Sequence, residues 1–266
     1  MVKSRLIKFN SILYEVFGLN IVRFLGSFKG LFFYVKDCIK FRKMYAGRFS
    51  LYPCLHDRFA EGGVTKSEYF VQDLLVARWI SEEKPNKHVD IGSRVDGFVA
   101  HVASFRDLEV FDVRSINTKI PGIIFNQADF MCHDIIKLGV EEGYCDSISC
   151  LHAIEHFGLG RYGDTIDPYG YERGIVNMAK LLRAGGLFYL STPIGKERVE
   201  FNAHRVFDPK TIINLCSANK LLLKKLTVIK NGVVENIQFS DDAVKKLSEE
   251  VYSLGIFVFQ KHKLAL

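Results

Sequence analysis

Two histidines and a glutamate are the residues in this sequence best suited to chemistry. Glu155 and His156 are adjacent in the segment His152-Ala153-Ile154-Glu155-His156, and His204 follows later in the chain. Imidazole titrates near neutral pH, so a positioned histidine can take a proton from a substrate hydroxyl. We therefore predict His156 or His204 as a general base, with Glu155 as a further catalytic residue. The alternative is that these histidines are hydrogen-bonded structural residues.

The same segment matches the His-x-x-Glu-His pattern of a class of zinc peptidases. That pattern needs a helix, which places both histidines on one face. Here an apolar strand precedes the segment, and Phe157-Gly158-Leu159-Gly160 follows it, so a helix of useful length does not fit. The sequence therefore disfavours a peptidase, and we predict no metal site.

Side chains suited to holding a substrate surround these histidines. They are Arg161, Tyr162, Asp164, Asn202 and Arg205. Guanidinium groups can bind a phosphate or carboxylate through two hydrogen bonds, and carboxylates and amides suit hydroxyl groups. We predict that these five residues bind a small-molecule or glycan acceptor, with a sugar or another polyhydroxylated molecule preferred. The alternative is a loop ordered by its own salt bridges.

Strands and helices alternate along the chain. Strands are expected at 87–91, 108–113, 122–127, 146–151 and 187–192, and helices at 66–83, 97–105, 133–139, 170–184 and 208–218. The helix at 170–184 is expected to end at the glycine signal of residues 183–186, and the apolar runs 221–229 and 255–260 flank a helical insert at 241–252. This alternation predicts a doubly wound parallel sheet that binds ligands at the carboxyl ends of its strands.

The first two expected strands each end in a carboxylate. Asp90 is followed by Gly92, as in a strand that enters a tight turn, and Asp112 ends the next strand. A carboxylate at the end of the second strand can accept hydrogen bonds from the hydroxyls of a ribose. The pattern therefore indicates a nucleoside site.

Several motifs together resemble those of a known superfamily. They are Asp90-Ile91-Gly92-Ser93-Arg94-Val95-Asp96-Gly97, Asp112, Asp129, Ile154-Glu155-His156 and the run 187–193. In order and spacing they resemble the class I S-adenosylmethionine-dependent methyltransferases, over about residues 50–262. Within that superfamily, Glu-His-Phe-Gly-Leu-Gly-Arg-Tyr-Gly-Asp (155–164) and Phe-Asn-Ala-His-Arg (201–205) are similar to a poorly characterised branch known as a domain of unknown function.

The resemblance implies a Rossmann-like, doubly wound, seven-stranded sheet with an antiparallel C-terminal strand. It also implies S-adenosyl-L-methionine as cofactor and transfer of its methyl group to an acceptor, which the polar side chains named above favour as a hydroxyl. Asp90 and Gly92 would lie at the methionine end, Asp112 at the ribose, and Asp129 with Phe130 at the adenine. The full set of cofactor residues that it implies is Asp90, Gly92, Ser93, Gly97, Asp112, Asp129, Phe130 and His152.

The first motif departs from the superfamily pattern, acid-x-Gly-x-Gly-x-Gly. Arg94 and Asp96 replace the second and third glycines, and Gly97 restores the third after a shift of one residue. This departure favours one alternative, a catalytically inactive binding module of the same fold. The other alternative, a nicotinamide-dependent oxidoreductase, lacks the Gly-x-Gly-x-x-Gly that it would need after the first strand.

Charge is concentrated at the start of the chain. The net charge is +6, yet residues 1–46 hold nine basic and two acidic residues, so the remainder is close to neutral. We predict a basic, aromatic helical extension at 1–46 and a methyltransferase-like domain at 47–266. The extension either touches an anionic membrane peripherally or packs on the main domain or on a second subunit, as in a homo-oligomer.

The composition also limits partners and location. With the basic residues outside the expected site, the sequence does not indicate a nucleic-acid partner. Its six cysteines contain no Cys-x-x-Cys pair, which favours reduced thiols and a cytoplasmic location, with the inner face of a membrane as a further option. We expect neither a transmembrane helix nor a signal peptide.

Overall fold

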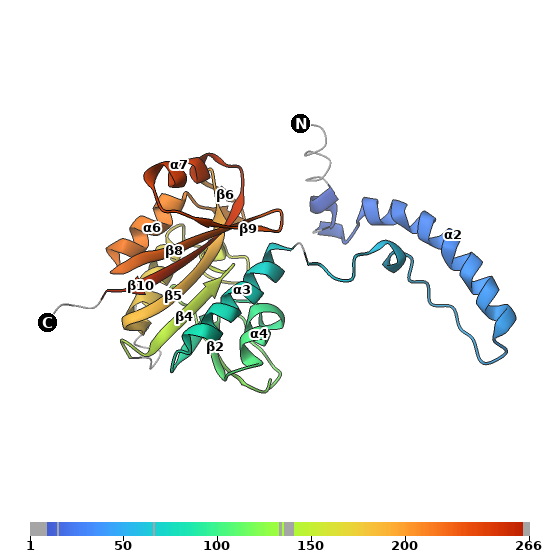
Figure 1. The fold of residues 1–266 in the computed structure, drawn as a ribbon, viewed down its shortest axis with the longest axis horizontal. Coiled ribbons are helices and arrows are strands. Elements are labelled where there is room, and N and C mark those ends of the chain that lie inside the picture. The colour runs from blue at the N-terminus through green and yellow to red at the C-terminus, as the bar shows by residue number, and fades with distance from the viewer. Residues whose placement is uncertain (1–9, 15, 66, 133–134, 136–140, 263–266) are drawn as a thin grey trace. The chain divides into compact units, whose positions relative to one another are not determined.

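The computed structural model describes residues 10–14, 16–65, 67–132, 135 and 141–262. The chain divides into two compact units, Met1–Val64 and Thr65–Leu266 (Figure 1). The predicted boundary after residue 46 stays a prediction. The helix predicted at 133–139 lies, apart from residue 135, outside the described residues.

The first unit contains one long helix, α2 (Ile21–Met44), and a short helical turn, η1 (Asp57–Phe59). The side chain of Asn20 caps α2 by accepting a hydrogen bond from the backbone N–H of Arg23 at 2.9 Å. The helix agrees with the basic helical extension that the sequence predicts. In the described part of the chain, no helix is long and apolar enough to cross a membrane.

An eight-stranded sheet forms the centre of the second unit, in the order β3-β2-β1-β4-β5-β10-β8-β9. Its strands are β1 (His88–Ile91), β2 (Leu108–Asp112), β3 (Ile123–Gln127), β4 (Cys145–Leu151), β5 (Leu182–Ile194), β8 (Leu221–Lys230), β9 (Val233–Ile237) and β10 (Ser253–Lys261). The first five pair in parallel, whereas β10 is antiparallel to both β5 and β8. The predicted Rossmann-like sheet with an antiparallel C-terminal strand is therefore confirmed.

The eighth strand, β9, adds an edge to the predicted seven-stranded sheet. It pairs with β8 through a two-residue turn, in which Asn231 and Gly232 have φ of 52° and 77°. Asn-Gly favours this tight hairpin because both residues tolerate positive φ, and the turn twists in the same sense as the strands. The dipeptide was a readable signal for the additional strand.

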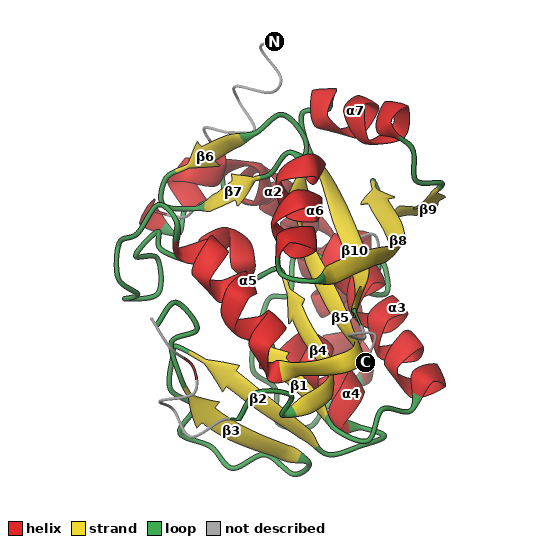
Figure 2. Ribbon diagram, turned by 90° about the vertical axis from the view of Figure 1, so that its left-hand side faces the viewer, coloured by secondary structure: helices red, strands yellow, loops and turns green. Residues whose placement is uncertain are grey.

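Helices cover both faces of the sheet (Figure 2). They are α3 (Glu68–Glu83), α4 (Ala100–Ala103), α5 (Gly170–Leu181), α6 (Pro209–Ala218) and α7 (Asp241–Glu249). One apolar core contains side chains of α5 and α6, and a second contains side chains of α3 and α4. Strand β10 supplies both cores, with Phe257 and Phe259 in the first and Ile256 and Val258 in the second, because alternate residues of a strand face opposite sides.

The junction between α5 and β5 differs from the sequence prediction. The helix was expected to end at residue 184, at a glycine signal, but it ends at Leu181 and β5 begins at once. The extended backbone of Leu182 already pairs with Cys145, and Gly185, with φ of 81°, lies in a bulge before pairing resumes at Leu187. The glycine therefore serves a strand bulge rather than a helix end.

Candidate functional site

A cavity of about 540 Å³ lies at the carboxyl ends of β1, β2 and β4. Ten of the predicted site residues line it: Gly92, Ser93, Asp112, Asp129, Phe130, His152, His156, Arg161, Tyr162 and Asp164. Six others do not: Asp90, Gly97, Glu155, Asn202, His204 and Arg205. The parallel strands thus bring residues far apart in the sequence to one edge of the sheet.

The turn after β1 forms one wall of the cavity. Asp90 is fully buried and accepts hydrogen bonds from the hydroxyls of Ser93 and Ser149, both at 2.6 Å, and from the backbone N–H of Ser93 at 3.0 Å. Burial raises the pKa of Asp90 to about 7, although these hydrogen bonds oppose the shift. Asp90 therefore holds the turn in place through its hydrogen bonds with Ser93.

Gly92 is the position where this turn requires glycine. Its φ is +72°, and a Cβ atom there would lie 3.0 Å from the Cβ of Ala153. A side chain would strain the backbone and crowd the loop that follows β4. The positive φ and the nearby Ala153 therefore both favour glycine at position 92.

Charged residues replace the next glycines of the turn. Arg94 and Asp96 line the cavity and form an ion pair of 2.7 Å, with side chains 64% and 74% exposed. Gly97 lies outside the lining, and a Cβ there would approach Asp73 Oδ2 to 2.7 Å. Gly97 thus allows close packing against α3.

Asp112 at the end of β2 is held by a nearby arginine. Its Oδ1 accepts hydrogen bonds from the backbone N–H of Arg114 at 2.8 Å and from Nε at 3.0 Å, and its Oδ2 accepts one from Nη2 at 2.6 Å. The same guanidinium lies 4.4 Å from the ring centroid of Tyr162 in the loop after β4. Arg114 therefore links the two loops that border the cavity.

Beyond β3 the wall of the cavity becomes apolar. Phe130 is 2% exposed and packs edge-to-face on Phe111, with ring centroids 5.6 Å apart. Asp129 Oδ1 accepts a hydrogen bond from the backbone N–H of Met131 at 2.8 Å, and Asn177 donates to the carbonyl of Phe130 at 2.8 Å. These bonds hold Phe130 in the part of the cavity lining that follows β3.

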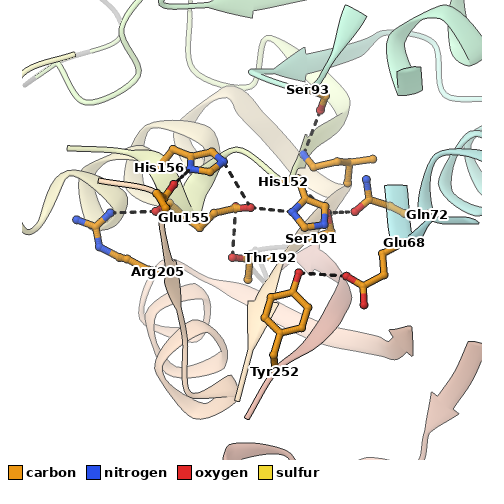
Figure 3. A network of polar contacts seen from close by, with 12 residues as sticks. Glu68, Gln72, Ser93, His152, Glu155, His156, Ser191, Thr192, Arg205 and Tyr252 are labelled. Atoms are coloured by element: carbon orange, nitrogen blue, oxygen red, sulfur yellow. Dashed lines mark hydrogen bonds and ion pairs between the residues drawn. The ribbon is translucent and has the colours of Figure 1, made fainter. Parts of the chain in front are cut away.

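Glu155 is on the short helical turn η4 (Ile154–His156), which follows β4. Its side chain lies between the rings of His152 and His156 (Figure 3). His152 Nδ1 donates a hydrogen bond to Glu155 Oε1 at 2.8 Å, and His156 Nε2 lies 3.9 Å from the same oxygen. Burial alone would raise the pKa of Glu155, but the bond from His152 and the proximity of His156 hold that pKa below its usual value. A carboxylate that is 1% exposed is thereby kept charged.

His156 is held in one tautomer. Its Nδ1 donates a hydrogen bond to the carbonyl of Ala203 at 2.7 Å, so the neutral ring carries its lone pair on Nε2. Burial lowers the pKa of His156, and its ring meets that of Tyr162 edge-on at 5.4 Å. The ring lines the cavity, so it has the properties of a neutral proton acceptor.

The other base candidate lies elsewhere. His204 is on β7 (His204–Val206), which pairs with β6 (Arg198–Glu200) in a separate two-stranded sheet. Its ring meets Tyr252 edge-on at 6.4 Å, and burial lowers its pKa too. Of the two predicted bases, only His156 lines the cavity.

Several of the solved structures that this fold resembles are methyltransferases. The N-methyltransferase NodS from Bradyrhizobium japonicum matches with 15% sequence identity and a TM-score of 0.50. The match covers 77% of this chain and all of that chain. The chain has the class I methyltransferase fold. A predicted sarcosine dimethylglycine methyltransferase from Galdieria sulphuraria matches with 11% identity, 71% of this chain, 86% of that chain and the same TM-score.

Two further matches have slightly lower TM-scores. NodS in complex with S-adenosylhomocysteine has 16% sequence identity and a TM-score of 0.48, and the match covers 79% of this chain and 92% of that chain. The CurJ carbon methyltransferase gives 12% identity, 72% coverage of this chain and a TM-score of 0.49, and the present chain spans 54% of that chain.

At the level of sequence, a family model described as "Caenorhabditis protein of unknown function, DUF268" matches residues 139–222. No curated protein matches the chain. The matched range contains η4, the loop after it and the strands β6 and β7, which is where the sequence motifs at 155–164 and 201–205 lie.

A tyrosine that no sequence motif indicates lies beside His152 in the cavity. Tyr69 on α3 lines the cavity and stacks on His152, with ring centroids 4.2 Å apart. Burial, with Glu155 nearby, raises the pKa of Tyr69 to about 12. Helical periodicity alone could not distinguish it from a core residue. His152 itself has φ of +50°, and its Nε2 is buried without a hydrogen-bond partner.

The loop after η4 is ordered by Asp164. Its carboxylate accepts hydrogen bonds from the backbone N–H groups of Gly158 at 2.9 Å, Gly160 at 3.2 Å and Tyr162 at 3.1 Å. Arg161 is exposed and donates to the carbonyl of Ala203 at 2.9 Å. The loop therefore presents Arg161 and Tyr162 to the cavity of this methyltransferase fold on a rigid support.

Arg205 and Asn202 lie outside the cavity lining. Arg205 is 5% exposed and donates to the carbonyls of Glu155 at 3.3 Å, Phe157 at 2.6 Å and Pro168 at 3.1 Å. Its guanidinium thus holds the backbone of the turn η4 and of the residue after it. Asn202 is exposed in the turn between β6 and β7. Within the described residues, no group of three or more His, Cys, Asp or Glu side chains is arranged to hold a metal ion.

Proposed function

We propose that the protein is an S-adenosylmethionine-dependent methyltransferase that methylates a hydroxyl of a small acceptor, preferably a sugar or another polyhydroxylated molecule. One observation carries this proposal. His156, whose neutral ring carries its lone pair on Nε2, lines the same cavity as the glycine turn at Gly92. NodS, which shares the fold, is named an N-methyltransferase and has been solved with S-adenosylhomocysteine.

The residues of the cavity fit this cofactor. A volume of about 540 Å³ is within the usual range of small-molecule sites. Gly92 and Ser93 would hold the methionine end, and Phe130 with Asp129 would border the adenine. Asp112 would bind the ribose hydroxyls, which must then replace donors of Arg114 on its carboxylate. The bound cofactor would supply an electrophilic methyl group on a sulfonium.

His156 would remove the proton of the acceptor hydroxyl. Nε2 of His156 would accept that proton while the acceptor oxygen takes the methyl group that the bound cofactor would supply. The charged Glu155, 3.9 Å away, stabilises the imidazolium that forms. His152 holds the carboxylate in place, so Glu155 and His152 act as positioning residues. His204, outside the cavity lining, is the second candidate for the base.

Arg161, Tyr162 and Asp164 support the acceptor assignment. Arg161 can offer guanidinium donors to a phosphate or carboxylate of the acceptor, while Asp164 holds the loop. Arg205 supports the site through backbone carbonyls, and a substrate role for Asn202 stays a prediction. Homo-oligomerisation and a cytoplasmic location also stay predictions.

A catalytically inactive binding module is the second candidate function. It is favoured by the Arg94–Asp96 ion pair where the superfamily has glycines, and by Arg114 on both oxygens of Asp112. In that case the cavity would hold a ligand without turnover.

Calorimetry on the full chain with S-adenosylmethionine, S-adenosylhomocysteine and NAD tests the proposal. We expect both sulfur ligands to bind and NAD not to bind. Asp112→Asn should weaken that binding by about tenfold, because a charged hydrogen-bond acceptor is lost. The matched control is Asp107→Asn, at the opposite end of β2, where the side chain is exposed.

Other outcomes exclude the proposal. Binding of NAD alone would indicate the oxidoreductase, and binding of none of the three would remove the cofactor assignment. Binding of both sulfur ligands, with no methyl transfer to any of a panel of sugars and sugar phosphates, would favour the inactive module.

A further inference from the structure

The long helix α2 of the first unit has two unlike faces. One face is covered by the chain segment 55–59 of the same unit. Gly30 is buried there, since a Cβ would lie 1.9 Å from the carbonyl oxygen of Leu55, and Ser27 Oγ lies 3.1 Å from His56 Nε2. The ring of Phe33 packs on that of Phe59 at 5.9 Å. This face of the helix therefore already has its partner.

The opposite face of α2 carries an apolar stripe. Its members recur three or four residues apart, so they lie on one side of the helix. Each is between 44% and 67% exposed, and they are Ile21, Phe24, Leu25, Phe28, Leu31, Phe32, Val35 and Ile39. An isolated exposed leucine needs no explanation, but eight large apolar side chains in one row do.

Basic side chains border this stripe. Lys36, Lys40 and Lys43 recur at spacings of four and three residues, so they form an exposed row along one side of it. The helix holds six basic residues and a single acidic one, Asp37, which is paired with Arg58 of the covering segment. The stripe and the lysine row together therefore form an apolar and cationic surface.

We infer that this surface of α2 binds peripherally to an anionic lipid membrane. The eight apolar side chains would enter the boundary between headgroups and acyl chains, and the lysine row would lie at the lipid phosphates. Charge complementarity selects this occupant, because an anionic bilayer offers apolar and negatively charged layers side by side along the whole length of the helix. The inference does not depend on the proposed enzymatic function.

Vesicle co-sedimentation of the full chain tests the inference. We expect binding to vesicles of phosphatidylcholine with phosphatidylserine, little binding to phosphatidylcholine alone, and weaker binding in roughly 1 M salt, where charges are screened beyond about 3 Å. The double variant Lys36→Glu, Lys40→Glu should lower the partition coefficient at least about tenfold, because each lysine near the surface contributes attraction.

Two further variants separate a lost surface from a lost fold. Phe28→Glu with Phe32→Glu should also abolish binding, whereas Phe28→Leu, which keeps an apolar side chain, should retain it. The controls are Val233→Glu on β9, at a position 66% exposed, and Lys246→Glu on α7, which is also exposed. Both controls should bind as the unmodified protein does.

Two results would overturn the inference. One is equal binding of the unmodified protein and the Phe28→Glu, Phe32→Glu variant to anionic vesicles. The other is no binding to any vesicle, together with light scattering that shows an oligomer broken by the same variant, which would make the stripe an interface between copies of this chain.

Discussion

The Oε1 atom of Glu155 lies 3.9 Å from the Nε2 atom of His156. The carboxylate is 1% exposed, and the hydrogen bond from His152 helps to keep it charged. A buried negative charge beside the free nitrogen of a histidine stabilises the protonated ring more than the neutral one. This relationship gives two predictions about catalysis.

Replacing His156 by Ala should lower kcat for methyl transfer by about 10²- to 10⁴-fold, the usual contribution of a general base. The affinity for S-adenosylhomocysteine should change little, because the proposed adenosine contacts lie at the carboxyl ends of β2 and β3 and not at η4. Steady-state kinetics with calorimetry measure both. A loss of activity in His204→Ala, with His156→Ala fully active, would move the base to the second candidate.

Replacing Glu155 by Gln should shift the pH profile of kcat. The charge of Glu155 raises the pKa of His156 against the larger, opposite effect of burial. Without that charge the pKa falls further, so the ring stays neutral to lower pH and the acid limb of the profile moves to lower pH. The plateau should also fall, because the base is weaker. An unchanged acid limb would contradict the role of Glu155 as the partner of the base.

Replacing Gly158 by Ala should destabilise the second unit by about 2–5 kcal/mol. The position has φ of +75°, and a Cβ would lie 1.9 Å from the carbonyl oxygen of Asp167. Gly163→Ala is the matched control, with φ of +81° but no atom within 4 Å, and should cost only about 1–2 kcal/mol. Urea unfolding followed by the fluorescence of Trp79, the sole tryptophan, measures both. Equal losses would show that the contact with Asp167 is unimportant.

The buried His88 should make stability fall in acid. Burial lowers the pKa of His88 to about 3, from 6.5 in the unfolded chain. Below pH 6.5 the unfolded chain binds a proton that the folded chain does not, so this contribution to stability is complete above pH 6.5 and is lost as the pH falls towards 3. Between about pH 7 and about pH 5 the expected loss is about 2 kcal/mol.

The variant His88→Gln isolates this effect. Glutamine cannot take up a proton, yet it can still hydrogen-bond to Ser147 and Ser149, which contact His88 at 2.7 and 3.1 Å. Urea unfolding at several pH values should show a flatter dependence for the variant. A slope as steep as that of the unmodified protein would assign the acid sensitivity to other groups.

The sequence by itself predicts the sheet and the edge at which the cavity lies. Apolar runs that end at Asp90 and Asp112, alternating with helical periodicity, specify parallel strands because these signals are local. Local signals also explain the errors. The Asn231-Gly232 turn was not used to predict β9, and the glycines at 185 and 186 predicted a helix end where β5 has a bulge.

Tertiary structure alone decided which candidates meet. His156 and His204 look equivalent in the sequence, yet only His156 lines the cavity, and Tyr69 on α3 reaches His152 from more than eighty positions earlier in the chain. The contacts of Arg114 with Asp112 and of Arg205 with the backbone carbonyl of Phe157 were likewise fixed by packing. Sequence periodicity tells which face of an element is buried, but the distance between two side chains on different elements depends on how those elements pack, and no local pattern encodes that.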